Sequence, residues 1–194
     1  MPSRTALPRV CIALGFAEPR KLLAHAKREV EAGEKFLEFR LDYLDSPRQG
    51  IAVIKEFLDA NPDVTLLATC RRHQNHGRFN GSIDEQLTIL DAAVDAGAVA
   101  IDIEIETAEN AKTKAAALRS KVTVIVSYHN YDGTPAVEPV LRRMMKVPAD
   151  GYKLVTTARK PSDNSKVLDL AKTAKVPLIQ IGRASCRERV CLAV

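Results

Sequence analysis

Lys153 and His129 have residue types and a spacing that suit covalent chemistry on a carbonyl group. Lys153 lies in the segment Gly151–Thr156, whose other members are Gly, Tyr, Leu, Val and Thr. If this lysine points into a protein interior, burial favours the neutral amine, which attacks carbonyl carbons. A lysine at a strand end that reaches out to solvent would fit the same pattern.

His129 ends the apolar segment Val122–His129. Alternate residues of a strand share a face, so His129 shares one with Ser127 and is expected at the upper rim of the interior. Lys153 is then expected on the next strand. A histidine beside an iminium group can remove a proton from the adjacent carbon and later protonate a leaving hydroxyl. A purely structural histidine is the alternative.

Charged residues of other strand-like segments are further candidates for the interior. Glu38 and Arg40 share one face of a segment, and Arg71 ends another. Arginine binds carboxylates through two parallel hydrogen bonds, which suits an anionic substrate. A simple interior ion pair between Glu38 and Arg40 is the competing interpretation. Asp102 and Glu104 would either orient the histidine or lysine or balance the arginines.

The elements that must position these residues alternate regularly along the chain. Each expected strand is followed by a helical pattern, which indicates an α/β fold with a parallel sheet. The expected strands are Val10–Gly15, Phe36–Asp42, Val64–Arg71, Val99–Glu106, Val122–His129, Tyr152–Thr157 and Val176–Gln180. The expected helices run from Pro19 to a stop at Gly33, over Ile51–Ala60, from the capping residue Ser82 to Gly97, and over Ala108–Arg119, Glu138–Met145 and Ser162–Thr173.

Two architectures fit this alternation, an open doubly wound sheet and a (β/α)8 barrel. Central strands of open sheets are usually apolar on both faces. Here Asp42 continues the charged face of Glu38 and Arg40, and Asp102, Glu104 and Glu106 alternate with isoleucines. The first strand is also not followed by a glycine-rich phosphate loop. The pattern therefore favours a (β/α)8 TIM barrel, incomplete, with about seven strands and its active site at their carboxyl ends.

The last segment does not fit the alternation. Ile181–Val190 reads IGRASCRERV, without a strand-like or helical apolar pattern. It resembles the translation of a sequencing-adapter oligonucleotide. We therefore expect residues 1–180 to be part of a barrel domain and residues 181–194 to be a non-native tail that replaces the last βα unit. A genuine basic tail is the alternative.

The amino-acid composition argues against nucleic acids and membranes as binding partners. The chain has 194 residues, no Trp, 5% aromatic residues and a net charge of +5. Few aromatics argue against nucleic-acid binding by stacking, and no apolar segment reaches membrane-spanning length. The cysteines show no zinc-binding spacing, which favours a reduced, cytoplasmic setting. His73 and His76 lie without an acidic neighbour in Cys70–Ser82, which is interpreted as a mobile active-site loop rather than a metal site.

Four motifs together resemble type I 3-dehydroquinate dehydratase. They are EFRLDYL at Glu38–Leu44, CRR at Cys70–Arg72, SYHN at Ser127–Asn130 and GYKLVTTA at Gly151–Ala158. The resemblance implies a (β/α)8 fold, usually a homodimer, with no metal and no cofactor. It also implies a lyase that dehydrates 3-dehydroquinate to 3-dehydroshikimate through a lysine imine, in the shikimate pathway of aromatic amino acid biosynthesis.

The resemblance also implies roles for single residues. Lys153 matches the Schiff-base lysine and His129 the catalytic histidine. Glu38, Phe39 and Arg40 match the substrate-contacting segment of the second strand, and Arg71 matches the arginine after the third. Asn75 stands nearest to a loop glutamate that many members carry, and an amide cannot act as a base. The family's other substrate contacts lie beyond the seventh strand.

Two other interpretations remain open at this level. Another Schiff-base barrel enzyme, such as a class I aldolase, would also need a strand lysine. It would not predict His129 on the preceding strand together with the EFR and SYH motifs. The third possibility is an inactive fragment of the family.

Overall fold

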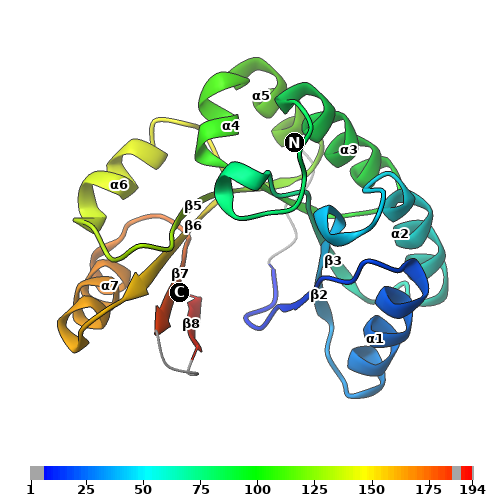
Figure 1. Ribbon diagram of the computed structural model, residues 1–194, viewed down its shortest axis with the longest axis horizontal. Helices are drawn as coiled ribbons and strands as arrows, with labels where there is room; N and C mark the ends of the chain where they lie inside the picture. The colour runs from blue at the N-terminus through cyan, green and yellow to red at the C-terminus, as the bar shows by residue number, and fades with distance from the viewer. Residues whose placement is uncertain (1–6, 185–188, 194) are drawn as a thin grey trace. The chain divides into compact units, whose positions relative to one another are not determined.

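The structure is a computed structural model that describes residues 7–184 and 189–193. The chain divides into two compact units. Unit 1 is made of Met1–Ile103 and Thr113–Val124, and unit 2 of Glu104–Lys112 and Ile125–Val194. Figure 1 labels the α-helices and the strands β2, β3 and β5 to β8. No helix in the described part of the chain is long and apolar enough to cross a membrane.

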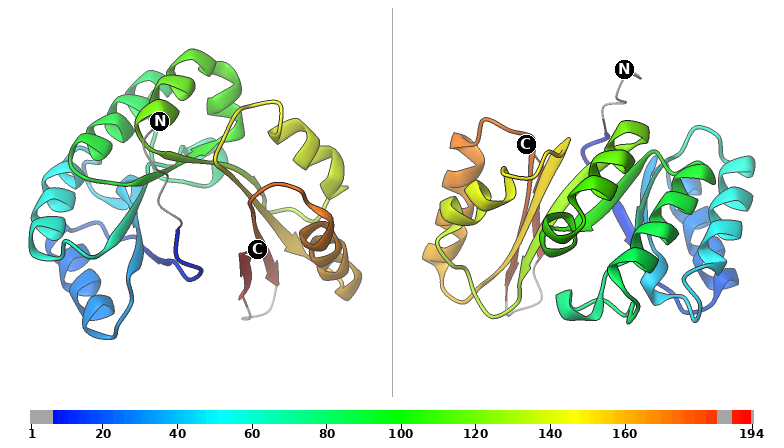
Figure 2. Two further views of the ribbon diagram at one scale, coloured as in Figure 1. Left: turned by 180° about the vertical axis from the view of Figure 1, so that it is seen from behind. Right: turned by 90° about the horizontal axis from the view of Figure 1, so that it is seen from above.

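Unit 1 is built from parallel strands that pair in chain order. The strands are β1 (Ile12–Leu14), β2 (Phe36–Arg40), β3 (Thr65–Thr69) and β4 (Ala100–Glu104). The α-helices are α1 (Pro19–Glu31), α2 (Gln49–Ala60), α3 (Ile83–Asp95) and α5 (Lys112–Lys121), and the short 3-10 helices are η1 (Leu41–Tyr43) and η2 (His73–Asn75). The α-helices lie along one side of the strands (Figures 1 and 2).

The apolar core of unit 1 lies between these strands and helices. The Phe39 ring packs 5.2 Å from the ring of Phe57 on α2, and both side chains are buried. Leu37 and Phe39 therefore face the helices, whereas Glu38 and Arg40 lie on the opposite face of β2. Each large apolar side chain buried in this way contributes about 1.5–3 kcal/mol to stability.

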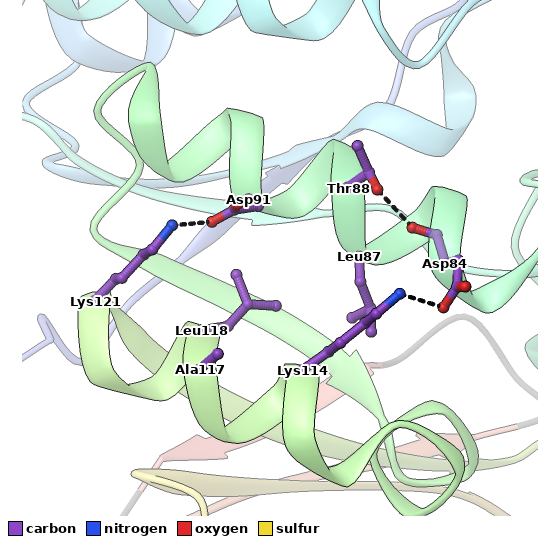
Figure 3. A pocket seen from close by; sticks show the side chains of 8 residues that line it. All are labelled: Asp84, Leu87, Thr88, Asp91, Lys114, Ala117, Leu118 and Lys121. Carbon is purple, nitrogen blue, oxygen red and sulfur yellow. Dashed lines mark hydrogen bonds and ion pairs between the residues drawn. The ribbon is translucent and has the colours of Figure 1, made fainter.

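Helix α5 is held against α3 on the outer surface of unit 1. Lys114 pairs with Asp84 at 2.7 Å and Lys121 pairs with Asp91 at 2.7 Å, on either side of a groove of about 280 Å³ (Figure 3). The hydrogen bond to Asp91 raises the pKa of Lys121. The groove is lined by Asp84, Leu87, Thr88, Asp91, Lys114, Ala117, Leu118 and Lys121. None of the predicted site residues lines it, so this groove is a seam between two helices and not the predicted site.

Unit 2 has a second set of paired strands. Strands β5 (Thr123–Asn130), β6 (Gly151–Ala158) and β7 (Leu178–Ala184) are parallel, and β8 (Arg189–Ala193) pairs with β7 in the antiparallel direction. The first two residues of β5 belong to unit 1. The helices of unit 2 are α4 (Ile105–Asn110), α6 (Val137–Met144) and α7 (Pro161–Thr173). Helices α6 and α7 pack on β6, and α7 also packs on β7.

The predicted alternation of seven parallel strands with helices is confirmed, with corrections around β4. The expected strand Val99–Glu106 ends at Glu104, and the single expected helix Ala108–Arg119 is two helices, α4 and α5. Starting a helix at Ile105 buries Ile105 and Ala108. It also lets Glu106 and Glu109 pair with Arg143 of α6, at 3.4 and 2.6 Å. Glu106 is therefore a helix-surface residue and not a member of the strand's charged face.

Parts of Ile181–Val190 are strand, although the side chains of this segment show no strand alternation. Strand β7 continues to Ala184, and β8 begins at Arg189. Val155 of β6 pairs with Ile181, and Thr156 pairs with Gly182. An open strand edge offers backbone groups to any neighbouring segment, whatever its side-chain pattern. Pairing with β6 therefore accounts for strand structure that side-chain alternation alone does not predict.

Candidate functional site

Lys153 and His129 lie on neighbouring strands of unit 2 and on the same face. Ser127 of β5 pairs with Lys153 of β6, and His129 pairs with Val155. Paired residues of parallel strands point the same way, and His129 is two residues beyond Ser127, which is roughly 6–7 Å along the strand. The Lys153 side chain is buried, with 8% of the residue exposed. The predicted placement of the two residues on adjacent strands is confirmed.

The loop after His129 is fixed to the end of the strand that carries Lys153. The side chain of Asn130 accepts hydrogen bonds from the backbone N–H groups of Asp132, at 3.0 Å, and Gly133, at 2.9 Å. The Thr157 N–H donates to the Gly133 carbonyl at 3.2 Å, and the Thr134 hydroxyl donates to the Thr157 carbonyl at 3.1 Å. These bonds tie β5 to β6 just beyond the His129–Lys153 pair.

Tyr131 is a member of this cluster that the sequence did not single out. Its ring is stacked against the His129 imidazole, with centroids 6.0 Å apart and an interplanar angle of 13°. In the sequence, Tyr131 is indicated only by its place between Asn130 and Gly133. The side chain of Asn130 forms a turn with Gly133, and this turn brings Tyr131 back toward the strand. Such an aromatic neighbour limits the orientations of the imidazole ring.

Unit 1 carries the predicted residues Glu38, Arg40, Arg71 and Asp102, and each has a polar partner. Glu38 Oε1 accepts a hydrogen bond of 2.7 Å from the Thr69 hydroxyl, and both residues are buried. The Arg71 guanidinium pairs with Asp102 at 3.0 Å, with 5% and 0% of the two side chains exposed. Of the two roles left open for Asp102, balancing an arginine is the one seen in unit 1.

Arg40 forms an ion pair with Asp42, whereas Glu38 accepts a hydrogen bond from Thr69. Arg40 Nε and Nη2 donate to the two carboxylate oxygens of Asp42 at 2.9 and 2.8 Å. Burial lowers the pKa of Arg40, but the hydrogen bonds to Asp42 and the charge of Asp42 outweigh it, so that the pKa lies above its ordinary value. Arg40 is therefore a permanent cation with a fixed orientation. Asp42 itself lies in η1, not in the predicted strand, because β2 ends at Arg40.

The side chain of Phe39 does not share a face with the side chains of Glu38 and Arg40. Its side chain is fully buried against Phe57 on the helix-facing side of β2. Strand geometry allows only alternate residues to reach one face, so the middle residue of the Glu38–Arg40 segment faces the core. The side chain of Phe39 therefore has a packing role, and the implied substrate contact of this residue stays a prediction.

The loop between β3 and α3 forms a closed turn over Arg71–Phe79. The Phe79 N–H donates to the Arg71 carbonyl at 3.1 Å, and the His73 N–H donates to the Phe79 carbonyl at 2.8 Å. A Cβ added to Gly77 would lie 2.0 Å from the Arg71 carbonyl oxygen, so the close approach requires glycine there. Asn75 closes η2 and is half-buried. Among the described residues, no group of three His, Cys, Asp or Glu side chains is placed to hold a metal ion.

The Arg71–Asp102 pair leads to a stability prediction. Asp102→Ala leaves the Arg71 charge buried without this partner, which we expect to lower the free energy of unfolding by about 3–5 kcal/mol. Urea denaturation measures the change. The double substitution Arg71→Met with Asp102→Leu should cost less than Asp102→Ala alone, because it removes both charges of the pair and leaves neither one buried without the other. A loss below about 1 kcal/mol in Asp102→Ala, the range of exposed pairs, would contradict the buried ion pair.

Known proteins resemble this chain over most of its length. A 3-dehydroquinate dehydratase of Dehalococcoides mccartyi is 37% identical over 144 residues, covering 72% of this chain and 61% of the relative. A 3-dehydroquinate dehydratase of Desulfotalea psychrophila is 31% identical over 192 residues, covering 94% of this chain and 81% of the relative. The chain thus spans 61% of the length of the Dehalococcoides mccartyi relative.

Solved structures identify the fold. The 3-dehydroquinate dehydratase of Geobacillus kaustophilus superposes with a TM-score of 0.79 at 23% identity, covering 91% of this chain and 74% of that one. The type I enzyme of Clostridium difficile, solved with covalently modified comenic acid, gives 0.77 at 23% identity, covering 90% and 75%. These likenesses confirm the α/β barrel fold that was predicted, in incomplete form. The family model of type I 3-dehydroquinase matches residues 10–186, and the chain belongs to this family.

Proposed function

We propose that this chain carries the chemistry of its family, the dehydration of 3-dehydroquinate to 3-dehydroshikimate through an imine on Lys153. The observation that supports this most strongly is the pairing of β5 with β6, which sets His129 and a buried Lys153 on one face of adjacent strands. Both the activity and the substrate are proposals for this chain, because it spans 61% of the Dehalococcoides mccartyi relative.

The proposed reaction begins with the neutral amine of Lys153. Its nitrogen attacks the ring ketone carbon of the substrate, and loss of the ketone oxygen as water gives a protonated imine. The iminium withdraws electrons, so the neighbouring carbon becomes acidic. His129 removes a proton from that carbon, and the electron pair of the C–H bond moves into an enamine.

Elimination and release complete the cycle. The enamine electrons expel the β-hydroxyl group, which leaves as water with the proton that His129 holds. The product is a conjugated iminium, still attached to Lys153. One water molecule then hydrolyses the iminium, which releases the product and returns the free amine. The net change is the loss of one water molecule from the substrate, as the dehydration requires.

The charged residues of unit 1 are proposed to bind the same substrate. Arg40 and Arg71 offer planar guanidinium groups that match a carboxylate, and Glu38 can accept a hydrogen bond from a hydroxyl group. Two observations support this part of the proposal. The chain matches the family, and each of the three side chains has a hydrogen bond or an ion pair that gives it a defined orientation. The covalent ligand of the Clostridium difficile relative supports covalent chemistry in this fold.

A homodimer and a cytoplasmic setting are also proposed, both on the resemblance to the family. Equilibrium sedimentation decides between a dimer and a monomer. The pathway assignment, biosynthesis of aromatic amino acids, follows from the proposed substrate and rests on the same family match.

Imine formation is the first prediction of this proposal. Incubation with 3-dehydroquinate and reduction with borohydride should add the mass of the reduced ligand to the peptide that contains Lys153. Lys153→Met, which keeps the volume of the side chain but has no amine, is the control and should give no adduct. An adduct with dihydroxyacetone phosphate and none with 3-dehydroquinate would instead favour the aldolase-like alternative. A soluble, folded chain that forms neither adduct would contradict the catalytic proposal.

The second prediction concerns His129. His129→Ala should still permit the imine on Lys153 but should slow proton removal by about 10²–10⁴-fold, the usual contribution of a general base. Exchange of the substrate's α-hydrogen with solvent deuterium, followed by mass spectrometry, measures this step. His25→Ala on α1 removes a histidine outside the cluster and serves as the matched control. Unchanged exchange in His129→Ala would show that another group is the base.

Within the expected tail of residues 181–194, the segment 189–193 that forms β8 is proposed not to belong to the family's barrel. Barrel strands are parallel, whereas β8 pairs with β7 in the antiparallel direction. Replacing these residues with a continuation typical of the family should raise solubility and sharpen the thermal unfolding transition, because β7 would gain a parallel neighbour. Cooperative melting of the present chain at a temperature equal to that of the replaced chain would contradict this proposal.

A further inference from the structure

A compact group of residues surrounds the carboxyl end of β2 in unit 1. It combines Asp42 and Tyr43 of η1 with Arg40 of β2, Arg78 of the loop after β3, and Gly15, which follows β1. Three segments far apart in sequence therefore meet around one carboxylate and one aromatic ring. We refer to these five residues as the β2 cluster.

Asp42 is the anionic centre of the β2 cluster. Its side chain is fully buried, with 0% exposed, against 16% for Arg40. One oxygen accepts from Arg40 Nε at 2.9 Å, and the other accepts from Arg40 Nη2 at 2.8 Å and from the backbone N–H of Arg78 at 3.1 Å. A single carboxylate thus holds the side chain of Arg40 and the backbone of the loop after β3.

Tyr43 is the second link between the same two arginines. The guanidinium carbons of Arg40 and Arg78 lie 4.7 and 4.1 Å from the centroid of its ring, within the range of cation–π attraction. The ring rests against Gly15, where an added Cβ would lie 3.0 Å from two ring carbons. The Tyr43 ring therefore has little room to move, and the guanidinium groups of Arg40 and Arg78 both pack against it.

The loop that Arg78 anchors carries Arg71 at its base. Arg71 and Phe79 are joined by the hydrogen bond that closes the turn, and Gly77 packs against the Arg71 backbone. The bond from Arg78 to Asp42 and the bonds that close the turn therefore connect the backbones of Arg78 and Arg71. Arg40 and Arg71 also lie near enough for the positive charge of Arg71 to lower the pKa of Arg40, although Asp42 outweighs this effect.

We propose that Asp42 and Tyr43 are positioning residues that hold Arg40 and the Arg71–Phe79 loop as one body, and that binding of the substrate carboxylate depends on this coupling. The inference rests on the proposed function for the identity of the ligand, a hydroxylated carboxylic acid. Asp42 and Tyr43 act through the two arginines and take no part in bond making. Their removal should therefore affect substrate binding more than the steps at Lys153.

The test compares Asp42→Asn with Asp84→Asn, the same chemical change at an exposed ion pair on α3. The first readout is backbone hydrogen exchange in the Arg71–Phe79 peptide. The second is the 3-dehydroquinate concentration that gives half-maximal borohydride trapping on Lys153. Asp42→Asn should speed the exchange and raise that concentration by roughly tenfold or more, since hydrogen bonds to a charged group are lost. The trapping rate at saturation should change less, and Asp84→Asn should alter neither readout.

Arg78→Ala provides a second variant at an exposed position, in case Asp42→Asn does not fold. It should also speed exchange in the loop and raise the half-maximal concentration, with a smaller effect because the backbone bond to Asp42 remains. Exchange equal to that of the unaltered chain in both variants would overturn the coupling. Faster exchange with an unchanged half-maximal concentration would overturn its role in carboxylate binding.

The two proposals fail in different ways. If the unaltered chain forms no adduct with 3-dehydroquinate, the proposed function is contradicted, but hydrogen exchange still decides whether Asp42 couples Arg40 to the loop. Faster exchange in Asp42→Asn would then support the coupling, and unchanged exchange would overturn it. If the adduct forms equally well in both Asp42→Asn and the unaltered chain, the function stands and the inference is overturned.

Discussion

The chemistry proposed for unit 2 depends on the register between β5 and β6. A shift of one residue would move Lys153 to the helix-facing side, because side chains alternate across a strand. Tyr152 fixes the choice of face, since its buried ring lies on the side opposite Lys153 and its hydroxyl donates to the Val147 carbonyl at 2.9 Å. At the other end, the backbone bond from Thr157 to Gly133 ties the strands together. The register is thus held at both ends by groups that take no part in the proposed reaction.

Unit 1 shows what a face of buried charges requires. Removing a charged group from water costs several kcal/mol, so such groups persist only with good partners. Glu38 has Thr69, Arg71 has Asp102 and Arg40 has Asp42. An apolar face of similar volume would cost the protein less. These pairs lie on the side of β2–β4 that faces away from the helices. Their presence there is explained if a charged ligand binds to them, and the family match points to such a ligand.

The sequence predicted the features that rest on periodicity and missed those that rest on tertiary contacts. Alternation placed Glu38 and Arg40 on one face and His129 beside the strand of Lys153. The same alternation puts the side chain of Phe39 in the core, whereas the family resemblance implied a substrate contact for Phe39 because it lies between Glu38 and Arg40. Glu106 continued an alternating pattern, yet the chain turns into α4, which buries Ile105 and Ala108 and lets Glu106 pair with Arg143, thirty-seven positions later. Residues 181–184 have no strand pattern and become strand through pairing with β6.

The end of β2 shows how a local departure from regular structure creates the proposed coupling. If β2 continued in extended form, Asp42 would lie roughly 6.6 Å beyond Arg40 along the strand, on the same face. The backbone of Arg40 leaves the extended region, with φ −83° and ψ 86°, and η1 begins at Leu41. This turn brings the Asp42 carboxylate back to the Arg40 guanidinium and under the Arg78 N–H. A longer β2 would add one more pair of ladder bonds but would lose the carboxylate that joins Arg40 to the loop. The early end of the strand, which sequence periodicity did not predict, is therefore the feature that makes Arg40 a fixed cation instead of a flexible one.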